Sequence, residues 1–206
     1  MVGNAASHTA QPLRSLALTQ VIFFALLAWC VAIDHSHTAQ VDGISFYGVF
    51  HRTLVQVGLA FVIASWGLWR AAGHLVALGA PALVAFGVRV VALSLYVVIA
   101  TPFNQGPLLN WTHMSVGVAM ALVQGAITVW LLARTRRGLA IGAFVVQLVG
   151  GLVAFASLPD WNFPYLLEGE IIYQVGFALA LVVWLLEVSD APLGAHHGVG
   201  DHVQGA

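Results

Sequence analysis

The chain has 206 residues, of which 60% are hydrophobic and only 7% are charged, and its formal net charge is −1. A soluble domain of this length carries about 25% charged residues, so the composition excludes an ordinary water-soluble fold. The near-neutral charge argues against nucleic acid as a partner, because nucleic-acid-binding domains present a basic surface. The single cysteine, Cys30, excludes an intramolecular disulfide.

Six apolar blocks follow one another along the chain, each close to the ~20 residues that cross a hydrocarbon core of about 30 Å. The blocks are 15–33, 53–69, 75–100, 111–133, 139–158 and 171–186. The third contains Pro81, which favours a helix that begins there. The sixth is short and could extend outward through Glu168 and Glu170. The sequence therefore predicts an all-α, polytopic bundle of six transmembrane helices.

The arginines predict how this bundle is oriented. With the N-terminus in the cytoplasm, five of the seven fall in cytoplasmic segments: Arg14, Arg70, Arg134, Arg136 and Arg137. Only Arg52 falls in an outer segment, and this asymmetry is the positive-inside bias. We therefore expect a multi-pass protein of the plasma membrane with both ends in the cytoplasm.

Three regions follow from this topology. Residues 1–14 are a cytoplasmic N-terminal segment, 15–187 the six-helix transmembrane domain, and 188–206 a cytoplasmic tail whose composition predicts disorder. A cleaved signal peptide in place of the first helix is an alternative, with a poor cleavage site at residues 30–32.

Polar residues that could bind a ligand gather on the predicted outer face. Zn²⁺ takes three or four His or carboxylate ligands, and two facing His can hold a haem. The candidate metal ligands are His35, His37, His51 and His113. Their spacing is not that of a metal motif, and a hydrated polar loop has the same composition. We therefore predict no cofactor and keep zinc and haem as alternatives.

The helix ends on this face predict one shared site. His51, His113 and Glu170 open the second, fourth and sixth helices at the same level. We expect these three side chains to meet in an outer pocket floored by the turn at residues 44–48. Asp42 and Ser45, which flank or lie in that turn, complete the candidate polar site.

Polar residues also occur within the apolar blocks. An arginine at a helix centre costs about 2.5–3.5 kcal/mol on insertion scales, so Arg89 should face the bundle or extend toward the interface. At similar depth its candidate partners are Gln124 and Gln147. Each Gln lies on a stripe of small residues, which indicates close helix packing, with a polar cavity as the alternative.

Short motifs resemble a known group of membrane proteins. The segment Asp42-Gly43-Ile44-Ser45-Phe46-Tyr47-Gly48 resembles the Ile-Ser-x-x-Gly signature after the first helix of the Frag1/DRAM/Sfk1 proteins and of the related bacterial DUF998 family. A Pro-containing loop at residues 101–103, followed by His113, is also similar. The chain lacks the Pro before Ile44 and has Phe46 where the eukaryotic pattern has Asp. The resemblance implies a six-helix, non-enzymatic protein that affects lipid organisation or scaffolds partners.

Signatures of common enzymes are absent from the sequence: it has no His-Glu-x-x-His, no phosphate loop, no Gly-x-Ser-x-Gly and no lysine. We expect a non-enzymatic scaffold or lipid-organising protein, with membrane lipids and other membrane proteins as partners. The alternative is a metal- or haem-binding subunit for electron transfer or complex assembly, using the outer-face histidines.

Overall fold

The computed structural model describes residues 5–135, 138–157 and 163–190, and this part of the chain is helical, with no strand. Its elements are α1 (Ala5–Ile33), α2 (His37–Asp42), the 3₁₀ helix η1 (Gly43–Gly48), α3 (Leu54–Ala77), α4 (Ala82–Ala100), α5 (Pro107–Arg134), α6 (Gly138–Ala156) and α7 (Leu166–Asp190). Six of these helices, all except α2 and η1, are long and apolar enough to cross a membrane. The predicted all-α polytopic bundle is confirmed.

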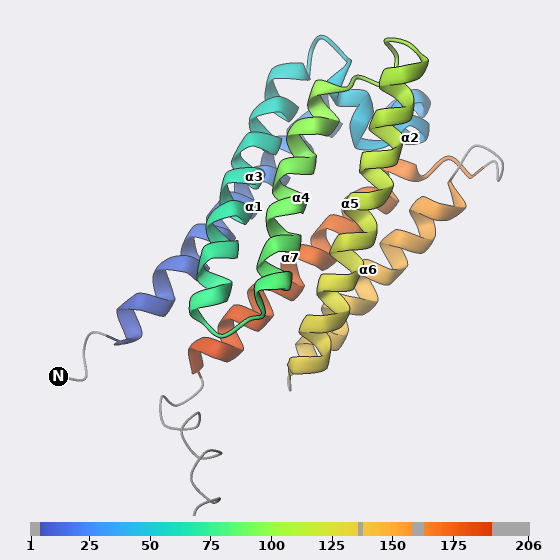
Figure 1. Ribbon diagram of the computed structural model, residues 1–206. Helices are drawn as coiled ribbons and strands as arrows, with labels where there is room; N and C mark the ends of the chain where they lie inside the picture. Colours follow the sequence, from blue (N-terminus) through green and yellow to red (C-terminus); the bar gives the residue numbers. More distant parts are fainter. Residues whose placement is uncertain (1–4, 136–137, 158–162, 191–206) are drawn as a thin grey trace, which may run out of the picture.

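The six long helices run side by side and alternate in direction (Figure 1). The start of α1 and the end of α7 lie at the same end of the bundle, which we call the inner end. The helices α2 and η1 lie at the opposite, outer end. Most of the predicted tail lies outside the described residues, and α1 includes much of the predicted N-terminal segment.

The α3–α4 hairpin corrects one predicted boundary. The second apolar block was expected to end at Trp69, but α3 continues for two more turns to Ala77. Gly79, with a φ of 86°, forms the turn in a left-handed conformation that favours glycine, and Pro81 immediately precedes α4. The start of the third helix at Pro81 is therefore confirmed, whereas Arg70 lies within α3 rather than in a cytoplasmic link.

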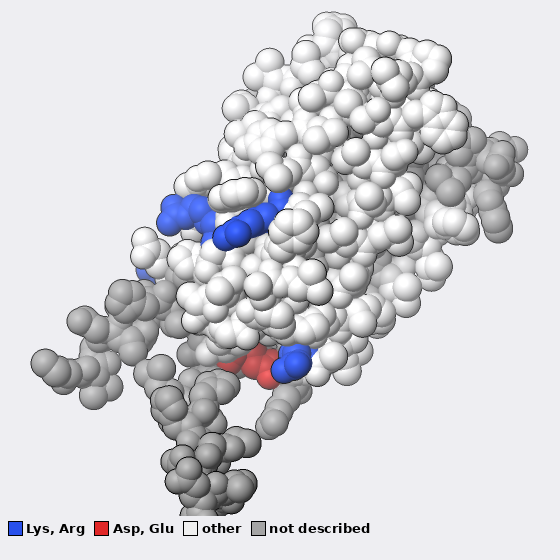
Figure 2. Space-filling view, viewed as in Figure 1, with Lys and Arg blue, Asp and Glu red and all other residues white. Residues whose placement is uncertain are grey.

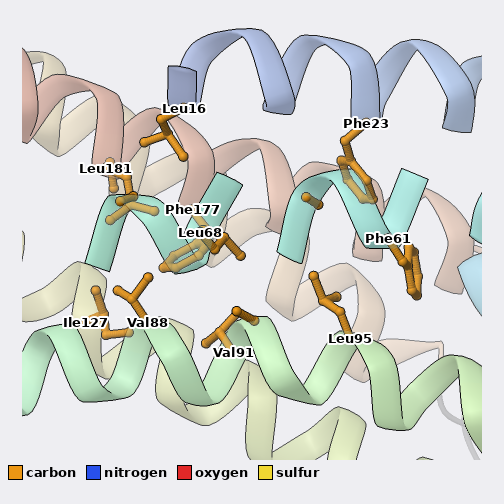
Figure 3. Packing of buried hydrophobic residues seen from close by; sticks show 14 of the residues in the cluster. Leu16, Phe23, Phe61, Leu68, Val88, Val91, Leu95, Ile127, Phe177 and Leu181 are labelled. Atoms are coloured by element: carbon orange, nitrogen blue, oxygen red, sulfur yellow. The ribbon is translucent and has the colours of Figure 1, made fainter. Parts of the chain in front are cut away.

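Close packing of apolar side chains forms the core between α1, α3, α4, α5 and α7 (Figure 3). The labelled side chains are Leu16, Phe23, Phe61, Leu68, Val88, Val91, Leu95, Ile127, Phe177 and Leu181. The hydroxyl of Ser65 adds an interhelical hydrogen bond, because it donates to the carbonyl of Ala92 at 2.8 Å. Lipid is as apolar as these side chains, so packing contacts and such hydrogen bonds hold the helices together.

Glycines allow α6 and α7 to approach until their backbones touch. A Cβ atom on Gly150 would overlap the backbone of Tyr173, and one on Gly176 would overlap the backbone of Gln147. A Cβ on Gly169 would likewise overlap Ala154. The predicted small-residue stripe on the fifth long helix therefore packs against α7.

This contact predicts opposite effects for two glycines of α6. Gly150→Ala should destabilise the protein by about 2 kcal/mol, since the added methyl group forces α7 away. Gly142→Ala should be neutral or stabilising by up to about 1 kcal/mol, because nothing lies within 4 Å of that position and alanine favours a helix. Reversible unfolding in mixed micelles measures both, and equal effects would contradict the close approach.

Candidate functional site

Residues 34–53 form a folded cap on the outer end, which we call the outer cap. Its first turn is fixed locally: the carboxylate of Asp34 accepts from the backbone N–H of Ser36 at 2.9 Å, and the Ser36 hydroxyl accepts from the N–H of Ala39 at 3.3 Å. The hydrogen bonds from Ser36 lower the pKa of the Asp34 carboxyl. The residue is therefore charged at neutral pH, and Ser36 is the N-cap of α2.

Glu170 of α7 holds the junction between α2 and η1. Gly43 has a φ of 69°, which reverses the chain between the two helices. The next backbone N–H, that of Ile44, donates to Glu170 Oε2 at 2.7 Å. A Cβ on Gly43 would overlap this carboxylate. Both the positive φ and the close approach of Glu170 therefore favour glycine at this position.

His113 of α5 holds the middle of η1. Its Nδ1 lies 2.8 Å from the carbonyl oxygen of Thr101 and 3.1 Å from that of Val98, so Nδ1 carries a proton and donates. In the neutral tautomer Nε2 is then an acceptor, and it lies 2.6 Å from the hydroxyl of Ser45, which donates to it. The imidazole therefore joins the end of α4 to the outer cap, and both of its nitrogens have protein partners.

Tyr47 is the largest of the completely buried side chains of the outer cap, with 0% of its surface exposed. Its hydroxyl donates to the carbonyl of Asp34 at 2.8 Å, and its own carbonyl accepts from the Thr53 hydroxyl at 3.0 Å. Burial raises the pKa of Tyr47 to about 12, so the phenol is protonated and acts as a donor at physiological pH. Tyr47 thus fastens the start of the cap to its end.

A small cavity of about 20 Å³ lies between the outer cap and helices α3, α4 and α5, enough for about one water molecule. Of the eleven residues around it, only Ser45 and His113 have polar side chains. The others are Ile44, Gly48, Val49, Val57, Phe61, Val98, Ile99, Pro102 and Phe103. The cavity therefore has apolar walls and one hydrogen-bonded pair.

The structure brings together only part of the predicted outer site. His113 and Glu170 both contact the turn at residues 44–48, through Ser45 and Ile44. His51 is exposed, packs its ring edge-on against Phe50, and does not line the cavity. The pocket predicted to be shared by all three is therefore not found, because α3 begins only at Leu54 and leaves His51 in the preceding turn.

The remaining outer candidates do not gather into one site. His35 Nε2 lies 3.1 Å from Glu168 Oε1, a contact with α7 that the sequence did not indicate. His37 is exposed, and Asp42 is partly buried, which raises the pKa of its carboxyl. Within the described residues, no three His, Cys, Asp or Glu side chains are placed to hold a metal ion.

The predicted intramembrane partnership of Arg89 is wrong. Its guanidinium lies over the ring of Trp69, at 5.5 Å from the centroid, and the side chain is exposed. Gln124 instead exchanges amide hydrogen bonds of 2.9 and 3.3 Å with Gln174 of α7. The amide of Gln147 is buried and has no hydrogen-bond partner in the described part of the chain. The sequence missed Gln174, although its type and depth match those of Gln124.

The Ser45–His113 contact resembles the first step of nucleophile activation, in which an imidazole accepts a hydroxyl proton. In a hydrolase the imidazole is usually oriented by a carboxylate, which stabilises its protonated form. Here two uncharged carbonyl groups orient His113. The arrangement is therefore better suited to fixing the position of the outer cap than to accepting a proton during catalysis.

Comparison of the chain with protein-family models, with curated proteins and with solved structures finds no match.

The junction at Gly43 predicts a sharp contrast with Gly48. Gly43→Ala should destabilise the outer cap by about 1–3 kcal/mol, because alanine disfavours the required backbone conformation and displaces Glu170. Gly48→Ala is the matched control, since that residue has no positive φ and no atom within 4 Å of an added Cβ. Proteolysis of the cap in intact vesicles measures the difference, and equal protection of both variants would contradict this account.

Proposed function

We propose that this chain is a non-enzymatic membrane protein that organises lipids, and that the outer cap is the part that contacts them. The observation that carries the proposal is the apolar cavity beneath the cap, which ends in the Ser45–His113 pair. Ligand sites combine mostly apolar walls with a few placed polar groups. A lipid near the headgroup region offers the matching combination of acyl chain and ester or hydroxyl.

The contacts that hold the outer cap support the proposal that the cap can move away from the bundle and admit a lipid group. The cavity as it stands has room for about one water molecule, so a lipid group enters only if the cap shifts. The cap packs Ile44 and Tyr47 into the core, and His35 contacts Glu168 of α7. Its hydrogen bonds to His113 and Glu170 each contribute about 0.5–1.5 kcal/mol net, or up to about 3 kcal/mol where one partner is charged. Lipid contacts of similar size could replace them.

The resemblance of residues 42–48 to the Frag1/DRAM/Sfk1 and DUF998 proteins belongs to the same proposal, since it implies a role in lipid organisation or scaffolding. The plasma membrane is the proposed location. The alternative of a metal- or haem-binding subunit would require His113 to give up one of its protein partners, because both ring nitrogens are engaged.

The proposal predicts that a substitution in the cavity wall also reduces the effect of the protein on lipid order. Purified protein reconstituted into vesicles should change the acyl-chain order reported by an environment-sensitive fluorescent probe. Ser45→Ala removes the hydroxyl that bonds His113, and Phe103→Ala removes part of the cavity wall. Each should reduce the change in order by at least about half, because the contacts at stake are worth about 1 kcal/mol.

The control is Ser94→Ala, in which the lost hydroxyl bonds only the Val90 carbonyl of its own helix. This variant should retain the wild-type effect on the probe. Absorption spectra and metal analysis of the same preparations address the alternative. A Soret band or stoichiometric metal that depends on His113 would overturn the lipid proposal, as would cap variants that behave like Ser94→Ala.

A further inference from the structure

Two arginines lie at the same depth on neighbouring helices. The helices α3 and α4 are antiparallel and are joined at the inner end by residues 78–81. Arg70 is seven residues before the end of α3 at Ala77, and Arg89 is seven residues after the start of α4 at Ala82. At 1.5 Å per residue, both Cα atoms are about 10 Å from the inner end of the hairpin.

Each guanidinium lies over a tryptophan of α3. Arg70 is 5.1 Å from the ring centroid of Trp66, and Arg89 reaches across from α4 to Trp69 at 5.5 Å. All four side chains are exposed on the outside of the bundle, with about half of each tryptophan accessible. Figure 2 shows two blue groups side by side over α3 and α4 on an otherwise mostly white face. We call these four residues the Arg–Trp patch.

Neither guanidinium is paired with a carboxylate of the described residues, and the ion pair of His35 with Glu168 lies at the outer end. Two positive charges about 10 Å from the inner end of membrane-crossing helices are costly to leave among acyl chains without a counter-charge, and each guanidinium lies against a tryptophan ring. The charges then need an anion from outside the chain.

The chemistry of the patch selects that anion. A guanidinium donates parallel hydrogen bonds to phosphate oxygens and retains its charge at every physiological pH. Tryptophan rings prefer the boundary between headgroups and acyl chains, and here they also support the guanidinium faces. Basic sites on the cytoplasmic side of transmembrane helices bind anionic headgroups in this way.

We propose that the Arg–Trp patch is a binding site for an anionic phospholipid of the inner leaflet, with its phosphate between Arg70 and Arg89 and its acyl chains along α3 and α4. The site is at the opposite end of the bundle from the outer cap. It does not depend on the function proposed for that cap, and none of its residues touches the cavity.

The test uses the full chain purified in a zwitterionic detergent, with phosphatidylglycerol as the probe and phosphatidylcholine as the uncharged comparison. Native mass spectrometry gives the number of bound lipids and their affinities. Wild-type protein should bind phosphatidylglycerol in preference to phosphatidylcholine. Arg70→Gln and Arg89→Gln should each weaken phosphatidylglycerol binding about fivefold, and the double variant about 25-fold.

Arg134→Gln is the matched control, because Arg134 also lies over a tryptophan, Trp130 at 5.6 Å, but at the last residue of α5. It should change the affinity less than twofold. Arg70→Lys and Arg89→Lys retain the charge but lose the parallel hydrogen bonds of the guanidinium, so each should weaken phosphatidylglycerol binding about twofold. These variants report on the site even if the double glutamine variant fails to fold. Inorganic phosphate at millimolar concentration, which lacks acyl chains, should not compete.

Several results would overturn the proposal. The double variant could bind phosphatidylglycerol within twofold of the wild type, or Arg134→Gln could weaken binding as much as the patch variants, which would indicate diffuse attraction. Equal binding of the two lipids by wild-type protein would also contradict it, and competition by inorganic phosphate would replace a lipid site by an anion site. The outer cap variants test a separate proposal. If they have no effect on lipid order, the binding results for the Arg–Trp patch keep the same meaning.

Discussion

Backbone groups that leave a helix near a membrane must find hydrogen-bond partners within the protein, because the bilayer offers few. The outer end of this bundle meets that requirement with side chains from other elements. Glu170 of α7 accepts from the Ile44 N–H, Tyr47 donates to the Asp34 carbonyl just after α1, and His113 donates to carbonyls at the end of α4. The folded outer cap exists because these three groups satisfy its backbone and that of its neighbours.

Because they satisfy these backbone groups, the polar residues of the outer end have a structural role. His113 satisfies α4 with Nδ1 and the outer cap with Nε2, so a change at Ser45 also alters how the end of α4 is held. The cavity beneath the cap lies along the same connection. Any molecule that enters it must therefore displace contacts that belong to two helices, which couples occupancy of the cavity to the packing of α4 against α5.

Hydropathy and residue type predicted the six spans, because the length and apolar content of a span are properties of one segment. They also indicated His113 and Glu170 at the predicted outer ends of helices, and Ser45 in the turn at residues 44–48. The pairings were beyond reach of the sequence. Ser45 meets His113 and Ile44 meets Glu170 only because of the order of the helices around the bundle, which a hydropathy pattern does not contain.

The expectations for the second span and for Arg89 were wrong because they also depend on how the helices pack together. The second span was expected to end at Trp69, yet α3 continues through Arg70 to Ala77, and the Arg70 guanidinium packs over the ring of Trp66. Gln124 and Gln147 were the expected partners of Arg89 because of their depth, with extension of its side chain toward the interface as the alternative. Gln124 faces α7, where Gln174 offers an amide of complementary geometry, and Arg89 faces away from the bundle.

The α6–α7 contact combines close backbone packing with an unpaired buried amide. Gly176 approaches the backbone of Gln147 so closely that no side chain fits between them, while the Gln147 amide is buried and makes no hydrogen bond within the described residues. An unpaired buried amide costs about 1–3 kcal/mol. Backbone contact at Gly150, Gly169 and Gly176 extends over about two turns of each helix, and each contact adds dispersion attraction. The close approach of α6 and α7 therefore rests on backbone contacts made by both helices, with the buried amide of Gln147 beside them.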